Sequence, residues 1–261
     1  MYYLGIDIGS LSCDAVLIDQ EERTLATSVV LTGARNQEAI ARATAEVMTK
    51  AGLTRDKISA IVSTGYGREQ VKDRNHDVTE ITCHARGITK LCPGTRVLID
   101  IGGQDSKAIF LNTEGRVMDF AMNDKCAAGT GRFLEAMARV MQIDLNELAA
   151  LDTGALGHVT ISSMCTVFAE SEVVSLIAGG VPVNEIAHGL NRAIATRTIT
   201  LVKRVAPDLK NFPIAMSGGV ALNSGVLRAL SSLLGKKISV PQNPETVGAL
   251  GAALIAREKS R

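Results

Sequence analysis

Two cysteines stand out in the sequence because each is surrounded by small and polar residues and is followed by a helical pattern. Cys126 lies in the segment Asn123–Gly131, after which apolar residues recur at helical spacing as far as Met141. Cys165 follows Ser162–Met164, and a second helical pattern then runs to Ile177. Helix starts favour anions because their N–H groups are unpaired and the dipole is positive there. A thiolate is stabilised in such a place, so both cysteines are candidate ligands.

The alternative is that each of these cysteines is only a small, buried apolar side chain, the usual state of a cytosolic cysteine. The chain has five cysteines, with no C-x-x-C pair and no zinc-finger spacing, which argues against a disulfide framework or a local zinc site. A metal on these thiols therefore needs cysteines that the fold, or a second chain, brings together. For Cys13, Cys83 and Cys92 we predict plain packing.

Composition narrows the classes of partner. The 261 residues are enough for two domains, and 28 Lys and Arg against 27 Asp and Glu give a formal charge of +1. This balance, with 3% aromatic residues, argues against binding to nucleic acid or to an anionic membrane. The first residues lack a basic leader, and no apolar run approaches the ~18 residues of a membrane span. The sequence predicts a cytoplasmic protein.

An internal repeat indicates the architecture. Ile6–Ser10 and Ile99–Gly103 share the pattern I-D-I-G, and the same register, without gaps, aligns Ala15–Asp19 with Ala108–Asn112. Two matches in one register predict a duplicated unit, each copy beginning with a β-hairpin. The tight turn of each hairpin exposes backbone N–H groups beside an aspartate, Asp7 or Asp100.

Strand and helix patterns alternate around these hairpins, which predicts an α/β fold. Asp144 and Glu147 are placed to form a capping box for one of the helices. We place a domain boundary near Pro93–Gly94, giving domains 1–93 and 94–244, with helix 245–261 returning to the first domain. The further helices are expected at 37–51, 79–91, from 145, at 183–205, at 225–234 and from 246, and the further strands at 58–63, 117–121 and 213–216.

The glycine turns suggest a nucleotide site. Glycine lets a backbone approach phosphates closely, and the carboxylates of Asp7 and Asp100 are hard oxygen ligands for Mg2+. Two facing hairpins can thus clamp a polyphosphate and hold two domains together. A third glycine turn, Ser217–Gly219, ends an apolar strand and offers a platform for a purine and ribose, with Asn223 as a polar contact. No P-loop and no G-x-G-x-x-G motif is present.

These motifs carry a family resemblance. Gly5–Ser10, Ile99–Lys107 and Ser217–Val220 resemble the two phosphate motifs and the adenosine motif of the acetate and sugar kinase, heat-shock chaperone and actin superfamily. Within it, Asn123–Phe133 and Ser163–Val173 closely resemble ATP-dependent activators of 2-hydroxyacyl-CoA dehydratases, whose features benzoyl-CoA reductase ATPase subunits share. The resemblance runs from Gly5 to about Ala253. It implies a duplicated actin-like ATPase (ribonuclease H-like) fold, with two domains around a nucleotide cleft.

The resemblance also implies an activity. In that family a homodimer holds one 4Fe-4S cluster at its two-fold axis with two cysteines from each subunit, which transfers to Cys126 and Cys165. Four thiolates are the usual ligand set of such a cluster, and a two-fold dimer doubles the two of one chain. The implied function is ATP-driven transfer of a low-potential electron from ferredoxin or flavodoxin to a dehydratase or reductase that has its own cluster.

The implied roles are hypotheses for individual residues. Asp7 and Asp100 organise Mg2+ and phosphate, and Asp100 or Gln104 orients the attacking water. Gln104 and Asp105 have turn stabilisation as an equal alternative. Phosphate contacts are assigned to Gly9, Ser10, Gly102, Gly103 and Asp105, and contacts with the adenosine of ATP or ADP to Ser217, Gly218, Gly219 and Asn223.

Two other functions compete with this one. The first is a cluster-free small-molecule kinase of the same fold, although the segments between the motifs are shorter than the substrate-binding insertions usual in such kinases. The second is a nucleotide-regulated assembly or chaperone protein, which needs an extension beyond the last motif. The sequence leaves the electron acceptor, its acyl-CoA substrate and the electron donor open.

Overall fold

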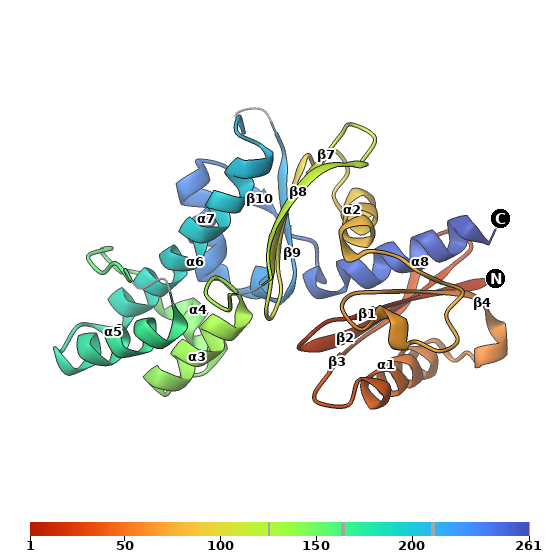
Figure 1. Cartoon of the computed structure of the whole chain (residues 1–261), viewed down its shortest axis with the longest axis horizontal. Coiled ribbons are helices and arrows are strands. Elements are labelled where there is room, and N and C mark those ends of the chain that lie inside the picture. The colour runs from red at the N-terminus through yellow and green to blue at the C-terminus, as the bar shows by residue number, and fades with distance from the viewer. Residues whose placement is uncertain (125, 163–164, 210–211, 261) are drawn as a thin grey trace. The chain divides into compact units, whose positions relative to one another are not determined.

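The computed structural model describes residues 1–124, 126–162, 165–209 and 212–260 and has the predicted α/β character (Figure 1). The chain forms two compact units. The first consists of Met1–Leu98, Ile109–Asp119 and Pro241–Arg261, and the second of Ile99–Ala108 and Phe120–Val240. The division therefore passes through three strands, and the domain boundary near residues 93–94 stays a prediction. These strands are β6 (Val97–Ile101), β7 (Ser106–Leu111) and β8 (Val117–Asn123).

The first unit contains a mixed sheet with the strand order β3-β2-β1-β4-β5. Its centre is β1, which pairs antiparallel with β2 to form the predicted hairpin and parallel with β4. The two-residue strand β5 was not predicted, because so short a strand has no alternating pattern of its own. The elements are β1 (Tyr2–Ile8), β2 (Ser12–Asp19), β3 (Thr24–Leu31), α1 (Asn36–Ala51), β4 (Ile58–Thr64), β5 (His76–Asp77), α2 (Glu80–Leu91) and α8 (Val247–Lys259), with 3-10 turns at Arg55–Lys57, Arg68–Gln70 and Pro244–Thr246.

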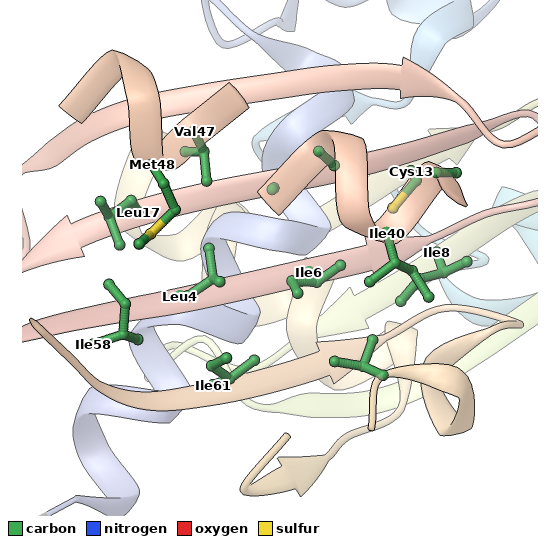
Figure 2. Close-up of a cluster of buried hydrophobic side chains, with 14 of the residues drawn as sticks. Leu4, Ile6, Ile8, Cys13, Leu17, Ile40, Val47, Met48, Ile58 and Ile61 are labelled. Carbon is green, nitrogen blue, oxygen red and sulfur yellow. The ribbon is translucent and has the colours of Figure 1, made fainter. Parts of the chain in front are cut away.

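Both faces of this sheet are buried at the central strands β1 and β2. Successive side chains of a strand point to opposite faces, so Leu4, Ile6 and Ile8 of β1 meet α1, as Figure 2 shows. Tyr3 of β1 belongs instead to the apolar cluster that includes α8. Asp7 shares the parity of Tyr3 and therefore lies on the α8 face of the sheet.

The C-terminal helix α8 is the main support of that face. Its residues from Val247 to Ala256 are all buried, and it packs against β1, β2, β4 and α2 (Figure 1). A helix that is apolar all round is expected inside a protein. Within the described ranges, no helix is both long enough and apolar enough to cross a membrane.

The second sheet has the order β10-β9-β6-β7-β8. In the second unit, α6 packs against α4 and α7, and α3 packs against α5. Asp144 precedes α4, but its side chain accepts no capping hydrogen bond, so the prediction of a capping box with Glu147 was wrong. The remaining elements are α3 (Gly131–Met141), α4 (Leu145–Leu151), α5 (Thr166–Ala178), α6 (Val183–Val205), β9 (Ile214–Ser217), a 3-10 turn (Gly219–Leu222), α7 (Ser224–Leu234) and β10 (Ile238–Ser239).

The two helices that follow the candidate ligand cysteines differ in burial. In α3, Phe133, Leu134 and Met137 are buried as a stripe. In α5 the buried residues are Ala169 and Val173, both small, whereas larger apolar residues face solvent. These exposed side chains, which we call the α5 apolar face, are Val167, Phe168, Val174 and Ile177.

Candidate functional site

The turn of the first hairpin joins β1 to β2. The amide of Gly9 donates to the carbonyl of Ser12 at 2.9 Å, and the hydroxyl of Thr32 donates to the carbonyl of Gly9 at 2.9 Å. Asp7 is buried at the end of β1, and Ser10 is half-buried in the turn. The hairpin thus presents Ser10 at its tip and places Asp7 behind it.

The second hairpin closes in the same way. The amide of Gly102 donates to the carbonyl of Asp105 at 3.0 Å, which is the counterpart of the Gly9–Ser12 bond. Gln104 is exposed in this turn, beside half-buried Gly103. In both turns the glycine amide is engaged within the hairpin, so any phosphate contact of Gly9 or Gly102 uses another atom.

Asp100, behind the second turn, is fully committed to neighbouring side chains. Ser217 donates its hydroxyl to Oδ1 of Asp100 at 2.6 Å, and Nζ of Lys107 lies 3.1 Å from Oδ2. The same Nζ lies 2.5 Å from Oδ2 of Asp105. All four side chains are buried, so two carboxylates that water does not reach share the ammonium of Lys107. Asp105 therefore stabilises the hairpin through an ion pair.

Sequence reasoning gave Lys107 no role. A signal was present, because Lys107 directly precedes the apolar run Ala108–Leu111, where a charged residue must find a buried partner. The repeat placed an aspartate on the neighbouring strand.

The third glycine turn packs directly onto the end of β6. Gly218 has φ +83° and ψ 167°, a conformation that side-chain-bearing residues rarely adopt. A Cβ at this position would also lie 2.3 Å from the carbonyl oxygen of Ile101. Gly218 thus allows Ser217 to reach Asp100. Gly219 begins the 3-10 turn that follows.

Asn223 combines a structural contact with an unused donor. Its Oδ1 accepts a hydrogen bond from the amide of Val226 at 2.9 Å, which makes it the N-cap of α7. Its Nδ2 is buried and has no hydrogen-bond partner among the described residues. The polar contact assigned to Asn223 therefore has an available atom.

Helix α3 begins on the turn of the second hairpin. The amide of Gly131 donates to the carbonyl of Gly102 at 2.9 Å, and the amide of Arg132 donates to that of Gly103 at 2.9 Å. These amides belong to the first turn of α3 and have no partner within the helix. The candidate phosphate turn is thus tied directly to the helix that follows Cys126. The sequence gave no sign of this link.

Cys126 is exposed in the segment between β8 and α3. Its carbonyl accepts a hydrogen bond from the side chain of Asn123 at 3.0 Å, and Thr130, not the cysteine, is the N-cap of α3. Beneath this segment the guanidinium of Arg197 lies 5.9 Å from the ring centroid of Phe133. Lys125, part of the same sequence motif, lies outside the described residues.

Cys165 is the N-cap of α5 and is also exposed. The carboxylate of Glu172, about two turns further into α5, accepts hydrogen bonds from the amide and hydroxyl of Ser162 at 3.0 and 3.1 Å. This pair fixes the chain shortly before the cysteine. Ser163 and Met164, which belong to the motif, lie outside the described residues.

The two candidate ligand thiols, those of Cys126 and Cys165, are both exposed. Among the described residues, no three Cys, His, Asp or Glu side chains gather as a metal site requires. Cys126 and Cys165 precede helices that pack against each other, and both thiols are exposed. This arrangement fits a group shared with a second copy of the chain.

The other three cysteines differ in their surroundings. Cys13 and Cys83 are fully buried in the two apolar clusters of the first unit, as predicted. Burial is the main cause that raises the pKa of each thiol to about 12. Burial also raises the pKa of half-buried Cys92. Thiolate, the reactive form, is therefore scarce at these positions.

We expect metal-free native protein to show two fast-reacting thiols per chain, Cys126 and Cys165. Cys13 and Cys83 should react only after unfolding, because both are buried and protonated. Anaerobic alkylation followed by peptide mass spectrometry measures each rate, with unfolded protein as the reference for full reactivity. Alkylation of Cys13 or Cys83 at the rate of Cys126 in folded protein would contradict this assignment.

Comparison with known proteins agrees with the resemblance that the sequence motifs predict. The profile of the BadF/BadG/BcrA/BcrD ATPase family matches residues 4–256. An activator of lactoyl-CoA dehydratase from Anaerotignum propionicum is 46% identical over 100% of this chain and 99% of its own length. The predicted resemblance to dehydratase activators is thus confirmed.

Solved structures confirm the predicted fold. The activator of the 2-hydroxyisocaproyl-CoA dehydratase from Clostridium difficile, with bound ADPNP, matches with a TM-score of 0.94 and 42% identity, covering 100% of this chain and 96% of that one. A ROK family glucokinase from Streptomyces griseus matches with a TM-score of 0.58 and 16% identity over 99% and 100% of the two chains. The latter likeness concerns the fold alone, and it agrees with the predicted actin-like ATPase fold.

Proposed function

The chain belongs to the BadF/BadG/BcrA/BcrD ATPase family, and from this premise we propose that it is an ATP-hydrolysing iron-sulfur activator of another enzyme. Its proposed activity is the transfer of one low-potential electron from ferredoxin or flavodoxin to a 2-hydroxyacyl-CoA dehydratase or a related reductase. The names of its relatives support a dehydratase as the acceptor. We place the protein in the cytoplasm.

One observation carries the proposal: helix α3 starts on the candidate phosphate turn. The bonds from Gly131 and Arg132 to Gly102 and Gly103 join the turn to the segment that holds Cys126. A shift of the turn when the nucleotide changes must either move α3 or break these bonds. Nucleotide state thereby acts on the position of a candidate ligand within a single unit. A kinase without a cluster has no use for an exposed cysteine at this point.

The nucleotide contacts divide between the two hairpins. In the first unit, Asp7 faces the cation, and Gly9 and Ser10 contact phosphate. In the second unit, the Gly102–Gly103 turn contacts phosphate, and exposed Gln104 is free of the buried ion-pair network and orients the attacking water. Asp100 holds this hairpin in shape through Lys107 and Ser217. Ser217, Gly218, Gly219 and Asn223 form the platform for adenosine.

The cluster site is proposed to be shared by two subunits. Cys126 and Cys165 of each chain provide two thiolates, and a two-fold dimer provides four, the ligand set of a 4Fe-4S cluster. Such a group supplies a carrier for one electron. The α5 apolar face begins directly after Cys165, and exposed apolar patches of this kind mark association surfaces. It is therefore the surface that we assign to the second subunit.

The test is the metal content of anaerobically purified protein. We expect about four iron atoms and four sulfides per dimer, and an EPR signal after reduction. Cys126→Ser and Cys165→Ser should each lose most of the iron. Cys92→Ser is the matched control, because this cysteine is half-buried and lies in the first unit, and it should keep the wild-type content.

The opposite result has a clear meaning. A protein that stays free of iron after anaerobic reconstitution, yet binds and hydrolyses ATP, would contradict electron transfer. The cluster-free small-molecule kinase would then be the better supported function. Equal iron loss in Cys92→Ser would contradict the ligand assignment.

A further inference from the structure

The two copies of the repeated hairpin carry opposite charges at one buried position. The register that aligns Asp7 with Asp100 also aligns Asp14 with Lys107. In the second copy, Lys107 lies 3.1 Å from the carboxylate of Asp100 and neutralises it. In the first copy the corresponding residue is itself an acid. The same backbone closure, from Gly9 to Ser12 and from Gly102 to Asp105, shows that the two hairpins are structurally equivalent here.

Asp14 and Asp7 lie side by side in the first hairpin. They are direct partners in the antiparallel pairing of β1 with β2, so their side chains share one face of the sheet. That face is covered by α8. The Asp7 carboxylate packs closely there, because a Cβ on Gly248 would lie 2.0 Å from its Oδ2.

Asp14 has an acceptor atom with no partner. Its Oδ2 accepts a hydrogen bond from the hydroxyl of Ser12 at 3.0 Å, but its Oδ1 is buried and bonded to none of the described residues. The residue is 5% exposed, so water does not compensate. Burial and the charges of Asp7 and Glu245 raise its pKa well above the usual range, and His84 acts in the opposite direction. Where the second hairpin has a lysine, the first hairpin therefore has a buried acid with one unpaired oxygen.

We infer that Asp14 joins Asp7 in holding the divalent cation of the bound nucleotide, while Asp100 serves the protein's internal network. This inference rests on the proposed binding of ATP. Mg2+ in nucleotide sites is commonly held by one or two carboxylates together with phosphate oxygens, so two acids are sufficient. In the second hairpin the ammonium of Lys107 already supplies the positive charge that a bound cation would supply in the first. The duplicated hairpin has thus diverged into one copy that holds the cation and one copy in which a lysine supplies the positive charge.

A shared proton is the competing explanation for two buried acids. In that case Asp14 is a neutral carboxylic acid that donates a hydrogen bond. Asp14→Asn separates the two, because asparagine keeps the size and a donor but lacks the negative charge. If Asp14 only donates a hydrogen bond, Asp14→Asn should keep that bond. If Asp14 holds the cation, the variant should bind the cation more weakly.

The experiment is an EPR titration of Mn2+, as a probe for Mg2+, into protein saturated with ADP. We expect Asp14→Asn to weaken Mn2+ binding about tenfold or more, whereas ADP binding without metal should not be weakened, because the change removes a negative charge that repels the phosphates. Asp14→Lys, which copies the second hairpin, should abolish the Mn2+ dependence of ADP binding. Asp19→Asn is the control, because it removes a buried carboxylate at the other end of β2, where Arg23 binds it.

The outcomes separate this inference from the proposed function. Wild-type protein that binds no ADP contradicts the function itself. Wild-type protein that binds ADP and Mn2+, with an unchanged Mn2+ affinity in Asp14→Asn, overturns the role of Asp14 alone. A loss of Mn2+ binding of the same size in Asp19→Asn also overturns it, because the effect then reflects a general loss of structure.

Discussion

Lys107→Met is expected to lower the free energy of unfolding by about 3–5 kcal/mol, the usual cost of breaking a buried ion pair by removing one partner. The side chain of Lys107 is 3% exposed and serves two carboxylates, those of Asp100 and Asp105. Methionine fills a similar volume but leaves both carboxylates without a countercharge. Urea unfolding of purified protein, analysed at constant slope, measures the loss.

A double variant identifies the cause of this loss. Lys107→Met with Asp100→Asn removes one of the two unbalanced charges and is expected to recover part of the stability, although neither residue is restored. The recovery should be the interaction term of a double-mutant cycle between neighbours. If the double variant were less stable than Lys107→Met by the full cost of Asp100→Asn alone, lost packing and not charge would be the cause. The ion pair would then have no special weight in the second hairpin.

The parts of the fold that followed from the sequence are those with local signals. The paired I-D-I-G strands, the glycine turns and the buried α3 stripe depend on residues close together in the chain, and the structure places each where it was expected. Helix α2 is another example, because it was expected at 79–91 and is found at Glu80–Leu91, with Thr79 as its N-cap. Local patterns therefore predicted the elements and the hairpins that present the candidate phosphate turns.

The contacts that connect the candidate sites did not follow from the sequence, because they join distant residues. Ser217 and Asp100 are 117 positions apart, and nothing in either neighbourhood specifies the other. The spacing of apolar residues in α5 predicted a helix but not which face is buried, since apolar residues occur all around it. The prediction of a capping box was wrong for a related reason. The motif permits a hydrogen bond between Asp144 and the start of α4, but the rest of the fold decides whether that bond forms.

Gly251→Ala is expected to lower the free energy of unfolding by about 2–4 kcal/mol. This is a net loss, because the higher helix propensity of alanine offsets about 1 kcal/mol of the cost of the clash. A Cβ on Gly251 of α8 would lie 1.7 Å from the carbonyl oxygen of Cys83 in α2 and 2.5 Å from its carbonyl carbon. Both are backbone atoms, so no side chain can move aside. Urea unfolding measures the effect. Gly189→Ala in α6 is the matched control, because its Cβ would meet Val159 at 3.0 Å and above; we expect it within about 1 kcal/mol of wild type.

The partner helix provides a further check on this explanation. A Cβ on Gly87 of α2 would lie 2.1 Å from the carbonyl oxygen of Val247 in α8, so each helix contributes one glycine to the crossing. Gly87→Ala should therefore cost about as much as Gly251→Ala. The two changes together should cost less than their sum, because a single separation of α2 from α8 relieves both contacts. Strict additivity would mean that the two glycines act independently and that no common helix displacement takes place. Since α8 also covers the face of β1 that holds Asp7, such a displacement should weaken ADP binding in the same variants, which a titration at fixed Mn2+ detects.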